Sequence, residues 1–179
     1  IFQCFVDSFL DEGGYGDAGI NCFIHGDIPS TPARRYPYND GGYFKDVFPA
    51  GVRLGKSIRG MSKERFNDTI KDALANRKAI GVSIGVVSSS GHIETIWGAE
   101  FDENGDIAYI YMSDNNDRDL FESDGIGCGR YQIVYGTYPE GGTYTGYLTG
   151  YIGSTKPVNI VGLTIIELGE EYWKRYFGL

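Results

Sequence analysis

The sequence predicts an α+β fold in which helices precede an antiparallel β-sheet. A strongly amphipathic helix, Ser62–Arg77, comes before the strand-rich part of the chain. After this helix, strand-like segments follow one another with connections of hairpin length, an order typical of an antiparallel sheet. Glycine makes up 27 of the 179 residues, about twice the average usage, and indicates many tight turns. We expect residues 1–179 to form a single domain with a sizeable core.

The predicted helix has both a start signal and a buried stripe. Ser62 is a good N-cap residue. The side chains expected to pack on the core recur with helical spacing at Phe66, Ile70, Ala73 and Leu74. Residues Ile1–Leu10 form a second apolar helical stripe. Two segments are ambiguous: Ile20–Ile24 is a strand or a helix, and residues 169–179 are a short amphipathic tail or a final strand.

The strands are predicted from alternating or continuous apolar residues between turn signals. They are expected at Ile80–Val87, His92–Phe101, Ile107–Met112, Tyr131–Tyr135, Thr143–Tyr151 and Val158–Glu167.

The charge balance excludes several classes of partner. The formal net charge is −8, and the sequence contains neither a basic patch nor a basic helix, so nucleic acid and anionic membranes are not expected partners. No apolar run approaches the roughly 20 residues of a membrane span. The abundance of glycine and tyrosine is typical of exported β-rich proteins. Because the sequence opens on Ile1, inside an apolar helical stripe, we expect a truncated or processed chain.

The three cysteines do not form a metal-binding pattern. Cys4, Cys22 and Cys128 are far apart, and no C-x-x-C pair occurs. His25 follows Cys22 by three residues, but no second pair of ligands completes a zinc site. We therefore predict neither a metal nor a cofactor. An odd number of cysteines leaves at least one thiol unpaired.

Residues Gly91–Asp117, GHIETIWGAEFDENGDIAYIYMSDNND, are predicted to form one β-hairpin. The first arm, His92–Phe101, alternates polar and apolar residues, and the second arm, Ile107–Met112, is β-branched and aromatic. Between them lies Asn104-Gly105, the dipeptide that best supports tight hairpin turns. The hairpin brings the histidine before the first arm and the acidic cluster after the second arm to the same end.

The length of the turn decides which acid meets His92. A two-residue turn at the Asn-Gly pair places His92 opposite Asp117. A five-residue loop over residues 102–106 places it opposite Asn116 and diagonal to Asp114. A shift of the pairing by one residue moves every side chain of a strand to the other face. This argument therefore leaves both Asp114 and Asp117 as candidates.

An imidazole beside a carboxylate is half of a nucleophilic triad. The acid fixes the tautomer of the histidine and stabilises the imidazolium that forms during the reaction. The alternative to a catalytic pair is that His92 lies on the surface or is hydrogen-bonded in the core, and that the acidic cluster is a solvated turn.

The hairpin resembles a known family of enzymes. Its histidine before the strand, Ile-Trp-Gly-Ala, Asp-x-Asn-Gly turn, Ile-Tyr arm and following aspartate are similar to the His–Asp hairpin of the immunoglobulin-G-degrading cysteine endopeptidases (IdeS/Mac type) of bacterial pathogens. This family is papain-like. The segments IKDALANRKAIGVSIG and VNIVGLTIIEL also resemble it. The likeness is strongest from Asn67 to Asp114.

The resemblance implies roles for particular residues. His92 would be the general base that takes the proton from a cysteine thiol, and Asp114, rather than Asp117, would hold its ring. Trp97 would shield this pair from water, with plain core packing as the alternative. Cys4 and Cys22 do not match the family's nucleophile, and Cys128 follows the histidine. The chain would thus be the C-terminal part of a papain-like peptidase, with the nucleophilic cysteine on an N-terminal segment or chain.

The implied function is that of one half of a secreted or cell-surface cysteine endopeptidase. Its substrate would be a protein, with host immunoglobulin G as the candidate, and this chain alone would be inactive. The rival hypothesis is a catalytically inactive papain-like module that binds immunoglobulin or another host protein. A weaker rival is a glycine- and tyrosine-rich β adhesin.

Overall fold

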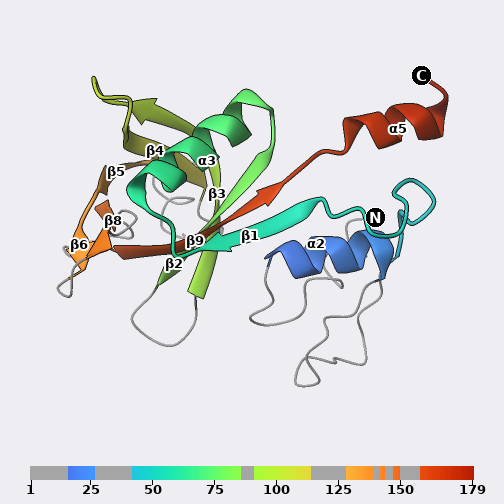
Figure 1. The fold of residues 1–179 in the computed structure, drawn as a ribbon, viewed down its shortest axis with the longest axis horizontal. Coiled ribbons are helices and arrows are strands. Elements are labelled where there is room, and N and C mark those ends of the chain that lie inside the picture. Colours follow the sequence, from blue (N-terminus) through green and yellow to red (C-terminus); the bar gives the residue numbers. More distant parts are fainter. Residues whose placement is uncertain are drawn as a thin grey trace. The chain divides into compact units, whose positions relative to one another are not determined.

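Residues 16–26, 42–85, 91–113, 128–138, 142–143, 147–149 and 158–179 are described by the structure, a computed structural model (Figure 1). The chain divides into two compact units. The first comprises residues 1–57 and 165–179, and the second comprises residues 58–164. Whether residues 1–179 act as one domain stays a prediction.

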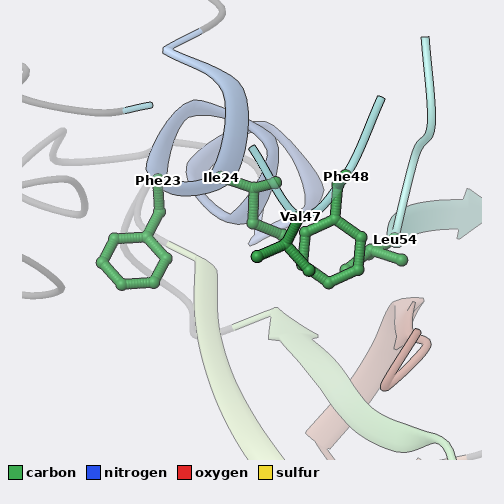
Figure 2. Packing of buried hydrophobic residues seen from close by; sticks show 5 residues of the cluster. All are labelled: Phe23, Ile24, Val47, Phe48 and Leu54. Atoms are coloured by element: carbon green, nitrogen blue, oxygen red, sulfur yellow. The ribbon is translucent and has the colours of Figure 1, made fainter. Parts of the chain in front are cut away.

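The first unit is built around helix α2, Gly16–His25. The segment that the sequence left as strand or helix is therefore helical. Its carbonyl groups at Phe23 and Ile24 accept hydrogen bonds from the amides of Tyr43 and Phe44, at 3.0 and 3.1 Å. Figure 2 shows the apolar cluster that this arrangement buries, which consists of Phe23, Ile24, Val47, Phe48 and Leu54.

The C-terminal residues of the same unit form helix α5, Glu170–Phe177. The alternative of a final strand is wrong, and the amphipathic tail is confirmed. Trp173 from this helix lies edge-on against Phe44 and Phe48, with ring centroids 5.4 and 5.3 Å apart. Such edge-to-face contacts add about 1 kcal/mol to the burial of the rings.

The second unit contains the predicted helix, observed as α3, Lys63–Ala75. Ser62 is its N-cap, and the Ser62 hydroxyl accepts a hydrogen bond from the Arg65 amide at 3.2 Å. The side chains of Phe66, Ile70 and Ala73 are completely buried. The cap is thus as predicted, and the apolar stripe is confirmed at these three positions, whereas Leu74 is only half-buried.

Replacing Ser62 with alanine is expected to destabilise the protein by about 1 kcal/mol, because one of the first amides of α3 loses its partner. Thermal or chemical unfolding of the variant measures this change. Ser62→Asp serves as the control, since aspartate caps helices as well as serine does. Equal losses in both variants would contradict a capping role.

The described strands form one seven-stranded sheet and a separate two-stranded sheet. They are β1 (Gly55–Arg59), β2 (Ala79–Gly85), β3 (Gly91–Phe101), β4 (Ile107–Ser113), β5 (Cys128–Val134), β6 (Thr137–Tyr138), β7 (Gly142–Thr143), β8 (Tyr147–Thr149) and β9 (Val158–Ile166).

The large sheet has the order β1-β9-β2-β3-β4-β5-β8, and β9 also pairs with β8. The strands from β9 through β2, β3, β4 and β5 to β8 therefore close into a ring. Successive strands from β2 to β5 are antiparallel, as are β5 with β8 and β8 with β9. The predicted fold class, α+β with helices followed by an antiparallel sheet, is confirmed.

Two features of the sheet were not predicted. Strand β1 has no clear sequence signal, and β9 enters the sheet between β1 and β2 although it is last in the sequence. The predicted strand Thr143–Tyr151 corresponds, in its described part, to the end of β7 and to β8.

The core of the second unit lies between α3 and the inner side of the sheet. Every second residue of β2 is buried there, and β4 contributes three completely buried side chains. The apolar side chains with less than 9% exposure in this unit are Met61, Phe66, Ile70, Ala73, Ile80, Val82, Ile84, Ile96, Ile107, Ile110, Met112, Tyr131, Ile133, Ile160 and Leu163.

Candidate active site

The hairpin of β3 and β4 closes through the five-residue loop 102–106. Phe101 pairs with Ile107 across the base of this loop. The carboxylate of Asp102 accepts hydrogen bonds from the backbone amides two and four residues later, both at 2.9 Å. Gly105 takes a positive φ of 79°. The two-residue turn is therefore wrong, because the Asp102 side chain organises a wider loop around the Asn-Gly pair.

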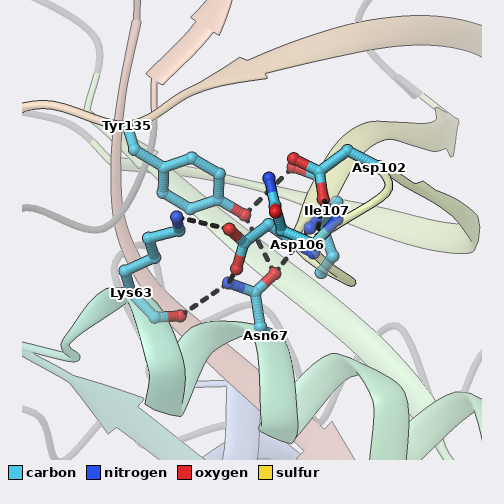
Figure 3. Close-up of polar contacts among 7 residues, drawn as sticks. Lys63, Asn67, Asp102, Asp106, Ile107 and Tyr135 are labelled. Carbon is cyan, nitrogen blue, oxygen red and sulfur yellow. Dashed lines mark hydrogen bonds and ion pairs between the residues drawn. The ribbon is translucent and has the colours of Figure 1, made fainter.

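Asn67 of α3 holds the closed end of this hairpin (Figure 3). Its side-chain oxygen accepts hydrogen bonds from the Ile107 amide at 2.7 Å and from the Tyr135 hydroxyl at 2.9 Å. Its side-chain nitrogen donates to the Lys63 carbonyl at 2.9 Å and to the Asp106 carboxylate at 3.2 Å. Asn67 is only 2% exposed. One buried amide thus joins the helix to the turn.

Two neighbouring groups keep the protonation states that these contacts need. Burial raises the pKa of Tyr135 to about 12, so its hydroxyl keeps the proton that it donates. The hydrogen bond to Asp106 raises the pKa of Lys63, which stays charged and forms an ion pair with that carboxylate. This cluster therefore stabilises the closed end of the hairpin, and the charges of Lys63 and Asp106 compensate each other.

Two β-bulges shift the register between β3 and β4. The paired positions are Phe101↔Ile107, Glu100↔Tyr109, Ala99↔Ile110, Gly98↔Tyr111, Ile96↔Met112 and Thr95↔Ser113. Ala108 is thus an extra residue on β4, and Trp97 is an extra residue on β3. The two shifts have opposite senses. At the open end of the hairpin the pairing is again the one that a regular five-residue loop gives.

The open end of the hairpin is where the sequence places the catalytic pair. His92 belongs to β3, and its backbone pairs with Ile84 of β2. Its side chain, like Asp114 and Asp117, lies outside the part of the chain that can be described. The juxtaposition of His92 with an acid therefore stays a prediction. The last described pair on the β4 side is Thr95↔Ser113, one residue before Asp114.

Glu94 is a buried acid that sequence reasoning overlooked. It lies two residues after His92 on β3, pairs with Val82 of β2, and is 2% exposed. A glutamate is almost never this buried without a polar or charged partner. The sequence feature that could have identified Glu94 is its spacing of two residues from both His92 and Ile96, which places these three positions on one face of a strand.

The outer face of the hairpin carries a different acid, Glu100. Its carboxylate accepts hydrogen bonds from the Arg130 guanidinium, at 2.8 and 2.7 Å, and from the Tyr111 hydroxyl. The Arg130 guanidinium also stacks on the Tyr109 ring, 3.3 Å from its centroid. The hydrogen bonds from Arg130 lower the pKa of Glu100 to about 2. This cluster ties β3, β4 and β5 together at the surface.

The Glu100 cluster predicts a pH-dependent stability. Because the pKa of Glu100 is lower in the folded protein than its ordinary value of 4.5, its stabilisation is complete above that pH and is lost as the pH falls toward about 2. The difference in melting temperature between the unmodified protein and Glu100→Gln is expected to be constant from pH 7 to about pH 5 and to shrink below. A constant difference down to about pH 2 would contradict this assignment.

Trp97, the bulge residue of β3, is 64% exposed. The alternative that it packs in the core is therefore wrong. The neighbouring Ile96 takes the buried position instead, at 4% exposure, because the bulge shifts the alternation of the strand. The shielding role of Trp97 stays a prediction.

The three cysteines and the second histidine belong to other elements or lie outside the described residues. Cys22 lies in α2, Cys128 opens β5 opposite Ser113, and Cys4 is outside the described part. The Nε2 of His25 donates a hydrogen bond to the Val52 carbonyl at 2.7 Å. Within the described ranges, no three His, Cys, Asp or Glu residues gather where they could hold a metal ion.

None of the helices among the described residues is both long and apolar enough to cross a membrane.

Comparison with known proteins places the chain in a family. The "IgM protease" of Streptococcus suis (strain P1/7) is 27% identical in an alignment over 177 residues that covers 94% of this chain and 15% of the relative. The chain thus spans less than a sixth of the length of this relative. The sequence model described as "Mac 1" matches residues 2–173. Because this match covers nearly all of the sequence, the chain belongs to the Mac 1 family.

Proposed function

We propose that this chain supplies the His–Asp part of a secreted or cell-surface cysteine endopeptidase that cleaves immunoglobulin. Its substrate class is supported by the similarity to the IgM protease, and by membership of the Mac 1 family. His92 is the general base and Asp114 is the acid that holds it. The nucleophilic cysteine is carried outside residues 1–179, on another part of the complete protein or on a partner chain.

The register at the open end of the hairpin carries this proposal. The last described pair is Thr95↔Ser113; a regular continuation of this pairing would bring position 114 opposite Glu94 and diagonal to position 92, on one face of the sheet. Position 117 would then fall on the opposite face, because faces alternate along a strand, and this supports Asp114 as the acid. The bulge at Trp97 is the feature that favours Asp114 over Asp117.

This arrangement supports peptide-bond hydrolysis by a thiol. The imidazole of His92 takes the proton of the cysteine, and the thiolate attacks the carbonyl carbon of the scissile bond. The imidazolium then gives the proton to the leaving amine as the C–N bond breaks. Water hydrolyses the resulting thioester and frees the enzyme. Asp114 stabilises the imidazolium and fixes which nitrogen faces the thiol.

The cysteines of this chain are poor candidates for the nucleophile. Position 128 pairs with Ser113, which lies on the face of Thr95 and not on the face of Glu94. Cys22 lies in α2, in an uncharged apolar segment that does not resemble the context of the family's nucleophile. These observations support a nucleophile that comes from outside the chain.

The test is cleavage of immunoglobulin M and immunoglobulin G by the complete protein, before and after treatment with a thiol-alkylating reagent. Native and denaturing mass spectrometry of the same material shows whether a second, cysteine-bearing chain is bound. Cleavage that alkylation stops is the expected result. Tight binding of immunoglobulin without any cleavage would overturn the proposal in favour of an inactive binding module.

A further inference from the structure

Loop 102–106 of the hairpin contains a chemically labile dipeptide. Asn104 is followed by Gly105, and no other asparagine of the sequence precedes a glycine. The backbone nitrogen of the residue after an asparagine lies close to the side-chain amide carbon, and a glycine there has no side chain that hinders an attack on this carbon. Asn104 is exposed, so water has access to the pair. The pair therefore has the chemistry of a deamidation site.

The geometry of the turn requires the glycine of this pair. Gly105 has a φ of 79°, in the left-handed region that residues with a side chain rarely adopt. Most other residues at position 105 would strain the turn at the point where the Asp102 side chain organises it. The fold thus keeps the dipeptide that favours deamidation.

The closed loop opposes the reaction at both reacting groups. The Gly105 amide donates a hydrogen bond to the Asp102 carbonyl at 3.0 Å. Hydrogen bonds from the Asp106 amide and from Asn104, through its backbone and its side chain, lower the pKa of Asp102. In the closed loop the nitrogen that would attack is therefore hydrogen-bonded elsewhere, and the side chain that it would attack is held by the Asp102 carboxylate.

Contacts with helix α3 hold the same loop closed (Figure 3). The Asn67 side chain accepts a hydrogen bond from the Ile107 amide and donates one to the Asp106 carboxylate, at 2.7 and 3.2 Å. Lys63 forms an ion pair with the same carboxylate. These contacts raise the free energy that is needed to open the loop, and so lower the fraction of molecules in which the glycine nitrogen can reach the asparagine side chain.

We propose that Asn104 is a site of spontaneous deamidation whose rate is set by opening of the closed end of the hairpin. In the open loop, the Gly105 nitrogen gives its proton to water and bonds to the Cγ atom of Asn104. The Cγ–Nδ2 bond breaks, the side-chain nitrogen takes a proton from water and leaves as ammonia, and a succinimide ring remains. Water then opens the ring at either carbonyl, which leaves aspartate or isoaspartate.

The products change the loop in which they arise. Each adds a negative charge to a segment that already carries the carboxylates of Asp102, Glu103 and Asp106. Isoaspartate also lengthens the backbone by a carbon atom, so the amides of residues 104 and 106 no longer fit the Asp102 carboxylate that accepts both at 2.9 Å. The reaction therefore weakens the closed end of the hairpin irreversibly. It is independent of the proposed catalytic activity.

The experiment measures how fast position 104 deamidates in the complete protein and in its variants Asn67→Ala, Asp102→Ala and Asn76→Ala. Peptide mapping by mass spectrometry separates asparagine, aspartate and isoaspartate at this position after incubation at a fixed pH and temperature. The unmodified protein in denaturant gives the rate of the open loop. Asn76→Ala is the matched control, because it removes exposed side-chain hydrogen bonds at the C-cap of α3 and none in the loop. The melting temperature of each variant shows that it is folded.

Position 104 is expected to deamidate at least about tenfold more slowly in the folded protein than in denaturant, because the closed loop must open first. Asn67→Ala and Asp102→Ala are each expected to raise the rate in the folded protein by at least about fivefold, since each removes hydrogen bonds that keep the loop closed. Asn76→Ala is expected to leave the rate unchanged.

Equal rates in the folded and the denatured protein would overturn the inference, because the loop would then give no protection. A rate that neither Asn67→Ala nor Asp102→Ala changes would also overturn it, because the contacts of the closed loop would then not control the reaction. An asparagine that persists at position 104 in denaturant would exclude this position as a deamidation site.

Discussion

Replacing His92 with alanine is expected to lower kcat for immunoglobulin cleavage by at least about 10³-fold in the complete protein. Without the imidazole, the cysteine thiol has no base to take its proton, and the leaving amine receives none. The backbone of His92 pairs with Ile84 at the edge of the described part of β3, so the substitution leaves the sheet register intact. The rate is measured under single-turnover conditions, with the melting temperature as a check on folding.

The control for this prediction is the second histidine of the chain. His25 hydrogen-bonds to the Val52 carbonyl and is not among the residues assigned to the proposed site. His25→Ala is therefore expected to retain kcat, even where its stability is reduced. Retained cleavage in His92→Ala, or an equal loss of kcat in both variants, would remove His92 from the role of general base.

The choice of acid is tested by a matched pair of substitutions. Asp114→Ala is expected to reduce kcat substantially more than Asp117→Ala, because a regular continuation of the pairing Thr95↔Ser113 would bring only position 114 to the face of position 92. Both variants remove one carboxylate from the same acidic cluster, so their effects on net charge are equal. The reverse order of effects would show that the register changes beyond Ser113.

The sequence was sufficient to predict the hairpin but not its bulges. Alternation in the arms and the Asn104-Gly105 pair located both strands and the turn correctly. The bulges at Ala108 and Trp97 have no comparable signal, because neither residue is a glycine. A large aromatic residue at position 97 favours burial by composition. Instead, Ile96 and Met112 are buried in the core, and this packing leaves Trp97 as the extra, exposed residue of β3.

The buried polar residues of the second unit were the hardest to predict. Asn67 and Glu94 are polar residues within otherwise apolar patterns, and secondary-structure propensities do not predict that such residues are buried. Their roles depend on contacts across about 40 residues of sequence, from α3 to the turn, or across neighbouring strands. Local periodicity carries no information about such partners. The insertion of β9 between β1 and β2 was missed for the same reason, since strand order depends on long-range pairing.

Asn67→Ala is expected to destabilise the second unit by about 3 kcal/mol. The buried amide of Ile107 loses its acceptor, the Tyr135 hydroxyl loses one of its two partners, and the Asp106 carboxylate loses a donor. Each buried group left without a partner costs about 1–3 kcal/mol. Hydrogen exchange of the peptide that spans loop 102–106 in the complete protein measures the local loss, and chemical unfolding measures the total.

Asn76→Ala is the matched control, because Asn76 is the same residue type at the C-cap of the same helix and also makes two side-chain hydrogen bonds, both to Asp72. Those bonds are exposed, so their loss is expected to cost less than about 1 kcal/mol. Faster hydrogen exchange in the loop for Asn67→Ala alone would show that Asn67 stabilises the turn and thereby the strand pairing of the hairpin. Equal exchange rates and equal losses of stability in the two variants would mean that the hydrogen bonds of Asp102 within the loop are sufficient to hold the closed end.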